Sequence, residues 1–239
     1  MVIHIHGKYK TALIAGKKHL PSYEIILWDT KRFNIHEVPW VEQAFNTKKY
    51  AFAADYIRLY ALYHHGGIYL DSDVEILKSL DNFLELPYFV GAETSGTIEA
   101  AILGAEKGCD WIKCCLDYYE GRNFIREDGS YDIRMLPEIL NETILRLKPV
   151  INMPSGSNID DLKKKDLGEA VYVLPKEYFS PKVFDSREVF LTPETHAIHH
   201  YQNSWFSHKA FAYYRTRTLF IKIFGYKAVR SLEKMLLKR

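Results

Sequence analysis

Two aspartates that follow the short apolar run Ile68-Tyr69-Leu70 are the first candidates for chemistry in this 239-residue chain. Asp71 and Asp73 are two positions apart on chain expected to be extended, which directs both carboxylates to the same side. Like charges that close repel unless a cation lies between them, and carboxylate oxygens suit Mn²⁺ or Mg²⁺. The pair therefore predicts a divalent-metal site, which would hold a diphosphate on its open coordination positions.

A helix is expected directly before these aspartates, because residues 48–64 carry apolar and aromatic side chains at helical spacing and Gly66-Gly67 ends the pattern. Asp55 and Arg58 are three positions apart and share a face of that helix. Charges on an otherwise apolar helix need a partner or a function. An arginine can counter a phosphate and an aspartate can accept hydrogen bonds from sugar hydroxyls. A surface ion pair within the helix is the alternative.

The segment from Tyr50 to Val74 resembles the D-x-D sugar-binding region of glycosyltransferase family thirty-two, which includes bacterial polysaccharide transferases and yeast initiating α-1,6-mannosyltransferases. Further matches are Pro21-x-Tyr23-Glu24-Ile25-x-x-Trp28, Gly104-Ala105-Glu106-Lys107-Gly108 and Ile198-His199-His200-Tyr201 with Ser204-Trp205. The resemblance implies a GT-A fold, in which a Rossmann-like sheet binds a nucleotide-sugar. It also implies that a divalent metal bridges the donor diphosphate to the D-x-D motif, and that transfer retains the anomeric configuration.

The resemblance also implies roles for individual residues. Asp73 would ligate the metal, and Asp71 would act directly or through water and the ribose. Asp55 and Arg58 would contact the donor sugar. The other residues implied in the donor and metal site are Tyr69, His200, Asn203 and Trp205.

Two neighbouring histidines compete for the place of third metal ligand. His199 and His200 point to opposite faces of a strand, so only one of them can face the metal. The resemblance favours His200, because it keeps the family's spacing to Trp205. The chain also departs from the family at a position implied in donor-sugar binding. Relatives often carry Asn in the strand before Gly104, whereas this chain has Glu99-Ala100-Ala101 there.

The remaining pattern predicts one α/β domain over residues 1–205 and a basic helical arm over residues 206–239. A hydrophobic share of 47% and a charged share of 26% are typical of a globular chain and exclude a disordered one. Strands are expected at 2–6, 23–28, 68–70, 74–76, 88–92, 100–105, 171–175 and 196–201. Helices are expected at 38–45, 48–64, 110–120 and 136–147, and residues 148–165 should form a loop with a short helix.

The arm differs in charge from the rest of the chain. Residues 206–239 hold five Lys, four Arg and one Glu, a net charge of +8, whereas the other 205 residues carry −6. Aromatic and aliphatic residues recur between these bases, which is typical of an interfacial helix on an anionic membrane. A packed helix with a solvated basic face is the alternative. Three clustered cysteines and an N-terminus without a long apolar region favour the cytoplasm, at the inner face of the membrane. A nucleic-acid partner is not expected.

The sequence thus predicts a metal-dependent, retaining glycosyltransferase that moves a hexose from a UDP- or GDP-sugar to a glycan or lipid-linked acceptor in surface polysaccharide synthesis. One rival is a haloacid-dehalogenase-type phosphatase, with Asp71 as nucleophile and with Asp160-Asp161 and Lys163 as its later acids and lysine. A metallohydrolase built on His4 and His6 is a second rival. A nucleotide-sugar-binding relative without turnover is the third.

Overall fold

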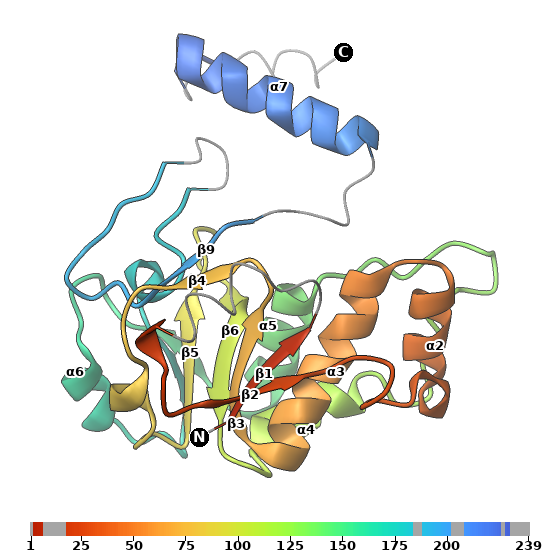
Figure 1. Ribbon diagram of the computed structural model, residues 1–239, viewed down its shortest axis with the longest axis horizontal. Helices are drawn as coiled ribbons and strands as arrows, with labels where there is room; N and C mark the ends of the chain where they lie inside the picture. The colour runs from red at the N-terminus through yellow and green to blue at the C-terminus, as the bar shows by residue number, and fades with distance from the viewer. Residues whose placement is uncertain (1, 7–17, 184–187, 202–207, 226–227, 230–239) are drawn as a thin grey trace.

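The computed structural model describes residues 2–6, 18–183, 188–201, 208–225 and 228–229. A five-stranded sheet forms its centre, in the order β2 (Glu24–Leu27), β1 (Val2–His6), β3 (Gly67–Asp71), β6 (Ile98–Ala105) and β5 (Tyr88–Ala92). The strands β2, β1 and β3 run parallel, whereas β6 is antiparallel to both of its neighbours. Figure 1 shows this mixed sheet in the middle of the body.

Four helices cover one face of the sheet: α2 (Pro39–Asn46), α3 (Tyr50–His65), α4 (Asp110–Asp117) and α5 (Leu136–Leu147). The helix α3 contacts β1, β3 and β6 as well as α2 and α4, so it lies at the centre of this layer. It ends where Gly66 adopts a φ of +66°; a Cβ there would lie 2.7 Å from the backbone nitrogen of Lys107, so only glycine fits. This sharp turn feeds the chain directly into β3.

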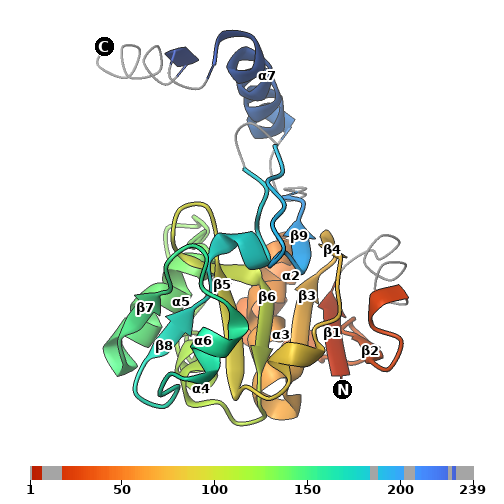
Figure 2. The ribbon, with the colours of Figure 1, turned by 90° about the vertical axis from the view of Figure 1, so that its left-hand side faces the viewer.

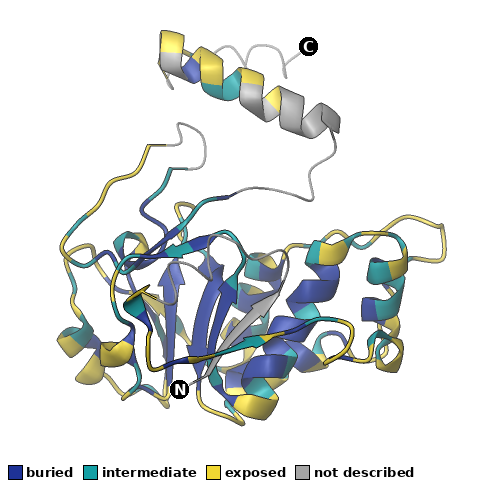
Figure 3. Cartoon of the chain, in the orientation of Figure 1, coloured by how far each residue is buried: buried dark blue, intermediate teal, exposed yellow. Residues whose placement is uncertain are grey.

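The opposite face carries β4 (Val74–Ile76), which pairs antiparallel with β9 (Ala197–His199). A second pair, β7 (Val150–Asn152) parallel with β8 (Val171–Val173), lies beside the edge strand β5, where Leu174 exchanges backbone hydrogen bonds with Val90 and Ala92. The helix α6 (Ile159–Lys163) and three 3₁₀ helices (Ile35–Glu37, Asp81–Phe83 and Lys176–Tyr178) complete the body. Phe83, Phe89, Tyr178 and Phe179 form an aromatic core beneath these elements. Figure 2 shows the strands β3, β6 and β5 side by side, with α3 behind them, and Figure 3 shows these three central strands as largely buried.

The last described helix, α7 (His208–Phe224), lies above the body in both ribbon views. Leu219, Phe220, Ile223 and Phe224 of this helix are each about half exposed or more, from 49% to 63%. Among the described residues, no helix combines the length and the apolar character needed to cross a bilayer.

The prediction of a mixed α/β fold is confirmed, and so are its principal elements. The expected helices at 48–64 and 136–147 correspond to α3 and α5, and the expected strands at 68–70, 88–92 and 100–105 correspond to β3, β5 and β6. The strand β7 was not expected, because a three-residue strand within residues 148–165 carries too little pattern to be recognised. The expected domain boundary after residue 205 lies outside the described residues.

Candidate active site

The two aspartates lie at the carboxyl end of β3, at an edge of the sheet where α/β proteins bind ligands. Asp71 is the last residue of β3, and Asp73 lies in the turn that leads into β4. The pairing of β4 with β9 sets Val74 opposite His199, so a residue from the end of the chain reaches the same turn. The Nε2 atom of His199 lies 3.6 Å from a carboxylate oxygen of Asp73.

The donor set at this turn fits a divalent cation. Asp71, Asp73 and His199 each offer one ligand atom, and these atoms all lie within 4.8 Å of one another. Two carboxylates and one imidazole are ligands that Mn²⁺ and similar divalent ions accept in proteins. The three side chains are partly buried, so an ion held among them would still be reached from solvent on one side.

Asp71 is supported from below by two buried side chains. The hydroxyl of Tyr69 donates to Asp71 Oδ1 at 2.7 Å, and the Nη1 atom of Arg58 lies 3.3 Å from the same oxygen. Arg58 also stacks over the Tyr69 ring, with 4.7 Å between the guanidinium carbon and the ring centroid. Tyr69 is 1% exposed, so its hydroxyl acts on the site through Asp71.

Asp55 and Arg58 form a buried ion pair beneath this group, and not the surface pair that was the alternative. Nη2 of Arg58 donates to Asp55 at 3.0 Å, and Nη1 donates to the carbonyl of Ala100 at 2.6 Å. The side chains of Arg58 and Asp55 are 6% and 12% exposed. Burial raises the pKa of Asp55 to about 7 against the lowering effect of Arg58. Burial alone would lower the pKa of Arg58, but the charges around it, that of Asp71 above all, raise it, so Arg58 stays cationic.

Glu99 is a residue of this site that the sequence did not single out for a role. It lies on β6, is 3% exposed, and its Oε2 atom is 3.0 Å from Nδ1 of His199. Burial alone would raise the pKa of Glu99, but His199 and further hydrogen bonds lower it to about 2. Burial alone would lower the pKa of His199, but Glu99 and Asp73 raise it to about 10. The signal available in the sequence was the departure from the family at this strand, where relatives often carry Asn and this chain has Glu99.

The structure brings His199, and not the expected His200, to the two aspartates. The two histidines do point to opposite sides, but His199 faces Asp73, whereas the Nε2 atom of His200 lies 2.7 Å from Glu75. Nζ of Lys182 donates to the backbone oxygen of His200 at 3.0 Å. The β4–β9 register causes this choice, because it brings the His200 backbone, and not its side chain, to Asp73.

Other residues named in the sequence analysis either lie outside the described side chains or have other partners. Asn203 and Trp205 lie outside the described residues, and His4 and His6 lie on β1, where only the backbone is described. The residues proposed for a phosphatase have other partners: Asp161 caps α6 together with Asn158, and Lys163 pairs with Glu85 at 2.5 Å. The structure therefore supplies no acid-and-lysine group for that rival chemistry among its described residues.

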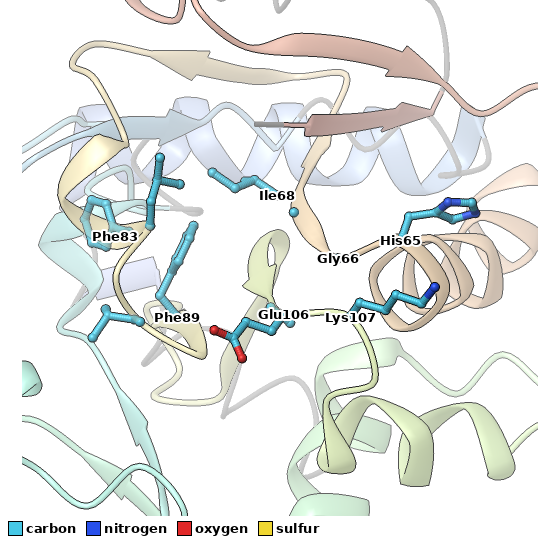
Figure 4. Close-up of a pocket in the computed structure, with 11 residues that line it drawn as sticks. His65, Gly66, Ile68, Phe83, Phe89, Glu106 and Lys107 are labelled. Carbon is cyan, nitrogen blue, oxygen red and sulfur yellow. The ribbon is translucent and has the colours of Figure 1, made fainter.

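A pocket of about 210 Å³ lies at the other end of β3 and is separate from the aspartates. Figure 4 shows Gly66 and Ile68 at its wall, with Phe83 and Phe89 on one side and Lys107 on the other. Most of its lining is apolar, and Asp71, Asp73 and His199 do not line it. The chemistry described above therefore belongs to the carboxyl end of β3 and not to this pocket.

The sequence matches the family described as the glycosyltransferase sugar-binding region containing the DXD motif, over residues 8–90. Inositol phosphoceramide mannosyltransferase 3 of Schizosaccharomyces pombe is 34% identical over 92 residues, which cover 37% of this chain and 26% of that protein. Mannosyl phosphorylinositol ceramide synthase SUR1 of Saccharomyces cerevisiae is 33% identical over 114 residues, covering 42% and 30%. Among solved structures, PaToxG Glycosyltransferase is similar with a TM-score of 0.44 and 18% identity, over 61% of this chain and 68% of that one.

The family match and the two yeast relatives confirm the resemblance to glycosyltransferase family thirty-two. The matched region contains α3, the turn at Gly66, β3 and both aspartates, so it includes all of the site except its contributions from β6 and β9. The matched stretches span less than a third of the two yeast proteins.

Proposed function

We propose that this protein is a metal-dependent, retaining glycosyltransferase that moves a hexose from a UDP- or GDP-sugar to a glycan or lipid-linked acceptor. The observation that carries this proposal is the Asp71, Asp73 and His199 group at the carboxyl end of β3, inside a segment that matches a DXD sugar-binding region. The parallel half-sheet β2-β1-β3, which ends at these aspartates, supports a GT-A-type donor site. The names of the yeast relatives support a hexose as the group transferred and a lipid-linked acceptor.

Each residue of the site has a distinct role in the proposed transfer. Asp71, Asp73 and His199 would hold the divalent ion, which as a Lewis acid neutralises charge on a leaving diphosphate. Arg58 keeps a positive charge directly beneath Asp71 and fixes the orientation of its carboxylate. Asp55 has one oxygen bound to Arg58, and its second oxygen is our candidate acceptor for a donor-sugar hydroxyl. Positioning of the acceptor against the donor is then sufficient, and we assign no carboxylate as a covalent nucleophile.

A screen of UDP- and GDP-sugars for donor hydrolysis that depends on Mn²⁺ tests the proposed function. We expect one nucleotide-sugar to be hydrolysed slowly to sugar and nucleoside diphosphate in the presence of Mn²⁺, and hydrolysis to stop with a chelator. Once the donor is known, transfer of its sugar to surface-polysaccharide acceptors would test the proposed role in surface polysaccharide synthesis. Hydrolysis of an aryl phosphate with trapping of an aspartyl-phosphate would instead support the phosphatase. Binding of a nucleotide-sugar without any turnover would identify an inert relative.

Replacing Asp55 with Asn tests the assignment of this residue to the sugar end of the donor. A charged hydrogen bond to a hydroxyl is worth roughly 1.5–3 kcal/mol, so we expect transfer and donor hydrolysis to fall about 10- to 100-fold. Affinity for the bare nucleoside diphosphate, measured by calorimetry, should stay within about twofold, because that ligand lacks the sugar. An equal loss of nucleotide affinity would assign Asp55 a structural role instead.

We further propose that residues 206–239 are an arm that docks the catalytic unit, residues 1–205, on the anionic cytoplasmic face of a membrane. The exposed apolar side chains of α7 (Leu219, Phe220, Ile223 and Phe224) recur on neighbouring turns, among the bases that give this segment its charge of +8. Phe190 and Leu191, which are about 60% exposed, add a second apolar segment. Each base near an anionic surface contributes about 1 kcal/mol, so the arm can hold the protein there without a spanning helix.

Co-sedimentation with vesicles tests this arm. We expect binding to vesicles that contain phosphatidylglycerol, weaker binding as salt rises, and loss of binding when residues 210–239 are deleted. The double change Phe220→Ser with Phe224→Ser should weaken binding to the vesicles at least tenfold, because two aromatic side chains that would be buried in the lipid are removed. The matched control is Leu145→Ser with Leu147→Ser on α5, two leucines that are also exposed. Equal binding to neutral vesicles, or equal effects of the two double changes, would contradict the proposal.

A further inference from the structure

The side chain of Glu99 is held by more donors than its burial alone requires. Its Oε2 atom accepts hydrogen bonds from Ser180 Oγ at 2.5 Å, from His199 Nδ1 at 3.0 Å and from the Tyr201 hydroxyl at 3.3 Å. Its Oε1 atom accepts from the backbone nitrogen of Ala101 at 2.9 Å. These donors come from β6, from the segment after the Lys176–Tyr178 3₁₀ helix, and from the end of β9, so Glu99 joins three parts of the fold behind the aspartates.

The network leaves one nitrogen of His199 directed at the aspartates. Because Nδ1 of His199 donates to Glu99, the atom directed at Asp73 is Nε2, at 3.6 Å. The ring of His199 is also fixed sideways by Tyr201, whose ring centroid lies 4.0 Å away. Tyr201 reaches this position through a left-handed backbone with a φ of 51°, which is uncommon for a tyrosine and is maintained only by surrounding contacts. The imidazole is thus held in orientation, with its Nδ1 hydrogen directed at Glu99.

We propose that Glu99 is a positioning residue that keeps the hydrogen of His199 on Nδ1 and so reserves Nε2 for a divalent cation shared with Asp71 and Asp73. This inference rests on the proposed metal-dependent function. Histidines that ligate metals commonly donate their second nitrogen to a carboxylate, which fixes the ring and makes it a better ligand. Ser180 does not make this group a nucleophilic triad, because it is 1% exposed and donates to Glu99 and not to His199.

The change Glu99→Gln tests the proposal, because a glutamine cannot satisfy both sides of the network. If its oxygen accepts from the Ala101 amide, its NH₂ group faces Nδ1 of His199 and moves the ring hydrogen to Nε2. If the amide is reversed, its NH₂ group opposes the Ala101 N–H. In the first arrangement Nε2 no longer has a lone pair for a metal. We therefore expect Mn²⁺ affinity, measured by calorimetry and by the free-Mn²⁺ resonance signal, to fall about 10- to 100-fold.

Two further variants serve as controls for the Mn²⁺ affinity of Glu99→Gln. His199→Gln should lose Mn²⁺ affinity at least as strongly as Glu99→Gln, whereas His200→Gln should stay within about twofold of wild type, because its side chain faces Glu75. Affinity of Glu99→Gln within twofold of wild type, with His199→Gln impaired, would overturn the role of Glu99 and leave the proposed function intact. A wild-type protein that binds no divalent cation would overturn both.

A measurement on the wild type keeps the proposal testable if glutamine at position 99 prevents folding. In protein loaded with diamagnetic Cd²⁺, long-range ¹H–¹⁵N spectra should show the ring hydrogen of His199 on Nδ1, with Nε2 shifted by the metal. A ring hydrogen on Nε2, or the metal on Nδ1, would overturn the assignment directly.

Discussion

Replacing Asp73 with Asn should lower glycosyl transfer about a thousandfold while leaving the protein folded. An amide at this position offers the cation a neutral oxygen in place of a charged one, and the charge of the leaving diphosphate is then less well balanced. Folding should survive, because Asp73 lies in a turn and His199 keeps its second carboxylate partner, Glu99. The measurements are the rate of transfer at saturating Mn²⁺, the Mn²⁺ affinity and the melting temperature.

The matched control for this change is Asp160→Asn, which neutralises an exposed aspartate in the first turn of α6. It changes the net charge of the protein by the same amount without touching the β3–β4 turn, so we expect transfer within about twofold of wild type. Wild-type turnover by Asp73→Asn in the presence of Mn²⁺ would show that the aspartate pair does not serve a metal in catalysis.

The parts of the fold that the sequence predicted are those decided by neighbouring residues. The helical spacing of apolar residues in α3, the glycine that ends it and the apolar run of β3 are all local features, and all three were recognised. The position of the aspartates at a strand end follows from the same local pattern. Resemblance to a known family added the region as a whole, because its match spans these elements in order.

The parts that escaped prediction depend on contacts between distant segments. Strand alternation shows that only one of His199 and His200 can face the aspartates, but the register of β9 against β4 decides which one. The partnership of Glu99 with His199 joins residues 100 positions apart, and no local pattern carries it. The burial of Arg58 against Asp71 depends likewise on how α3 packs on β3.

Replacing Arg58 with Ala should destabilise the protein by roughly 3–5 kcal/mol, since removal of one partner leaves a buried charge without compensation. Arg58 is 5% exposed, and its guanidinium has contacts to Asp55, to Asp71 and to the carbonyl of Ala100. No small side chain can replace these contacts. The free energy of unfolding, from urea titration monitored by circular dichroism, measures the loss.

A surface arginine provides the control for this substitution. Arg126 pairs with Asp132 at 3.1 Å, but its side chain is 54% exposed, so Arg126→Ala should cost less than about 1 kcal/mol. The double change Asp55→Asn with Arg58→Ala should recover part of the stability lost by Arg58→Ala alone, because the uncompensated carboxylate is then absent. If Arg58→Ala costs no more than Arg126→Ala, the buried network contributes nothing measurable to the fold.

The stability that Arg58→Ala loses should depend on pH in one direction. Burial already raises the pKa of Asp55 in the folded protein to about 7, well above the ordinary value of a carboxyl group. A folded-state pKa above the unfolded value favours the fold below the unfolded pKa, and that contribution is lost as pH rises through the folded pKa.

Without Arg58 the pKa of Asp55 must rise further, because its opposing positive charge is gone. Arg58→Ala should therefore lose less stability relative to wild type at pH 5, where Asp55 is protonated in the fold, than at pH 8. Equal losses at the two pH values would show that the charge of Asp55 is not what Arg58 compensates.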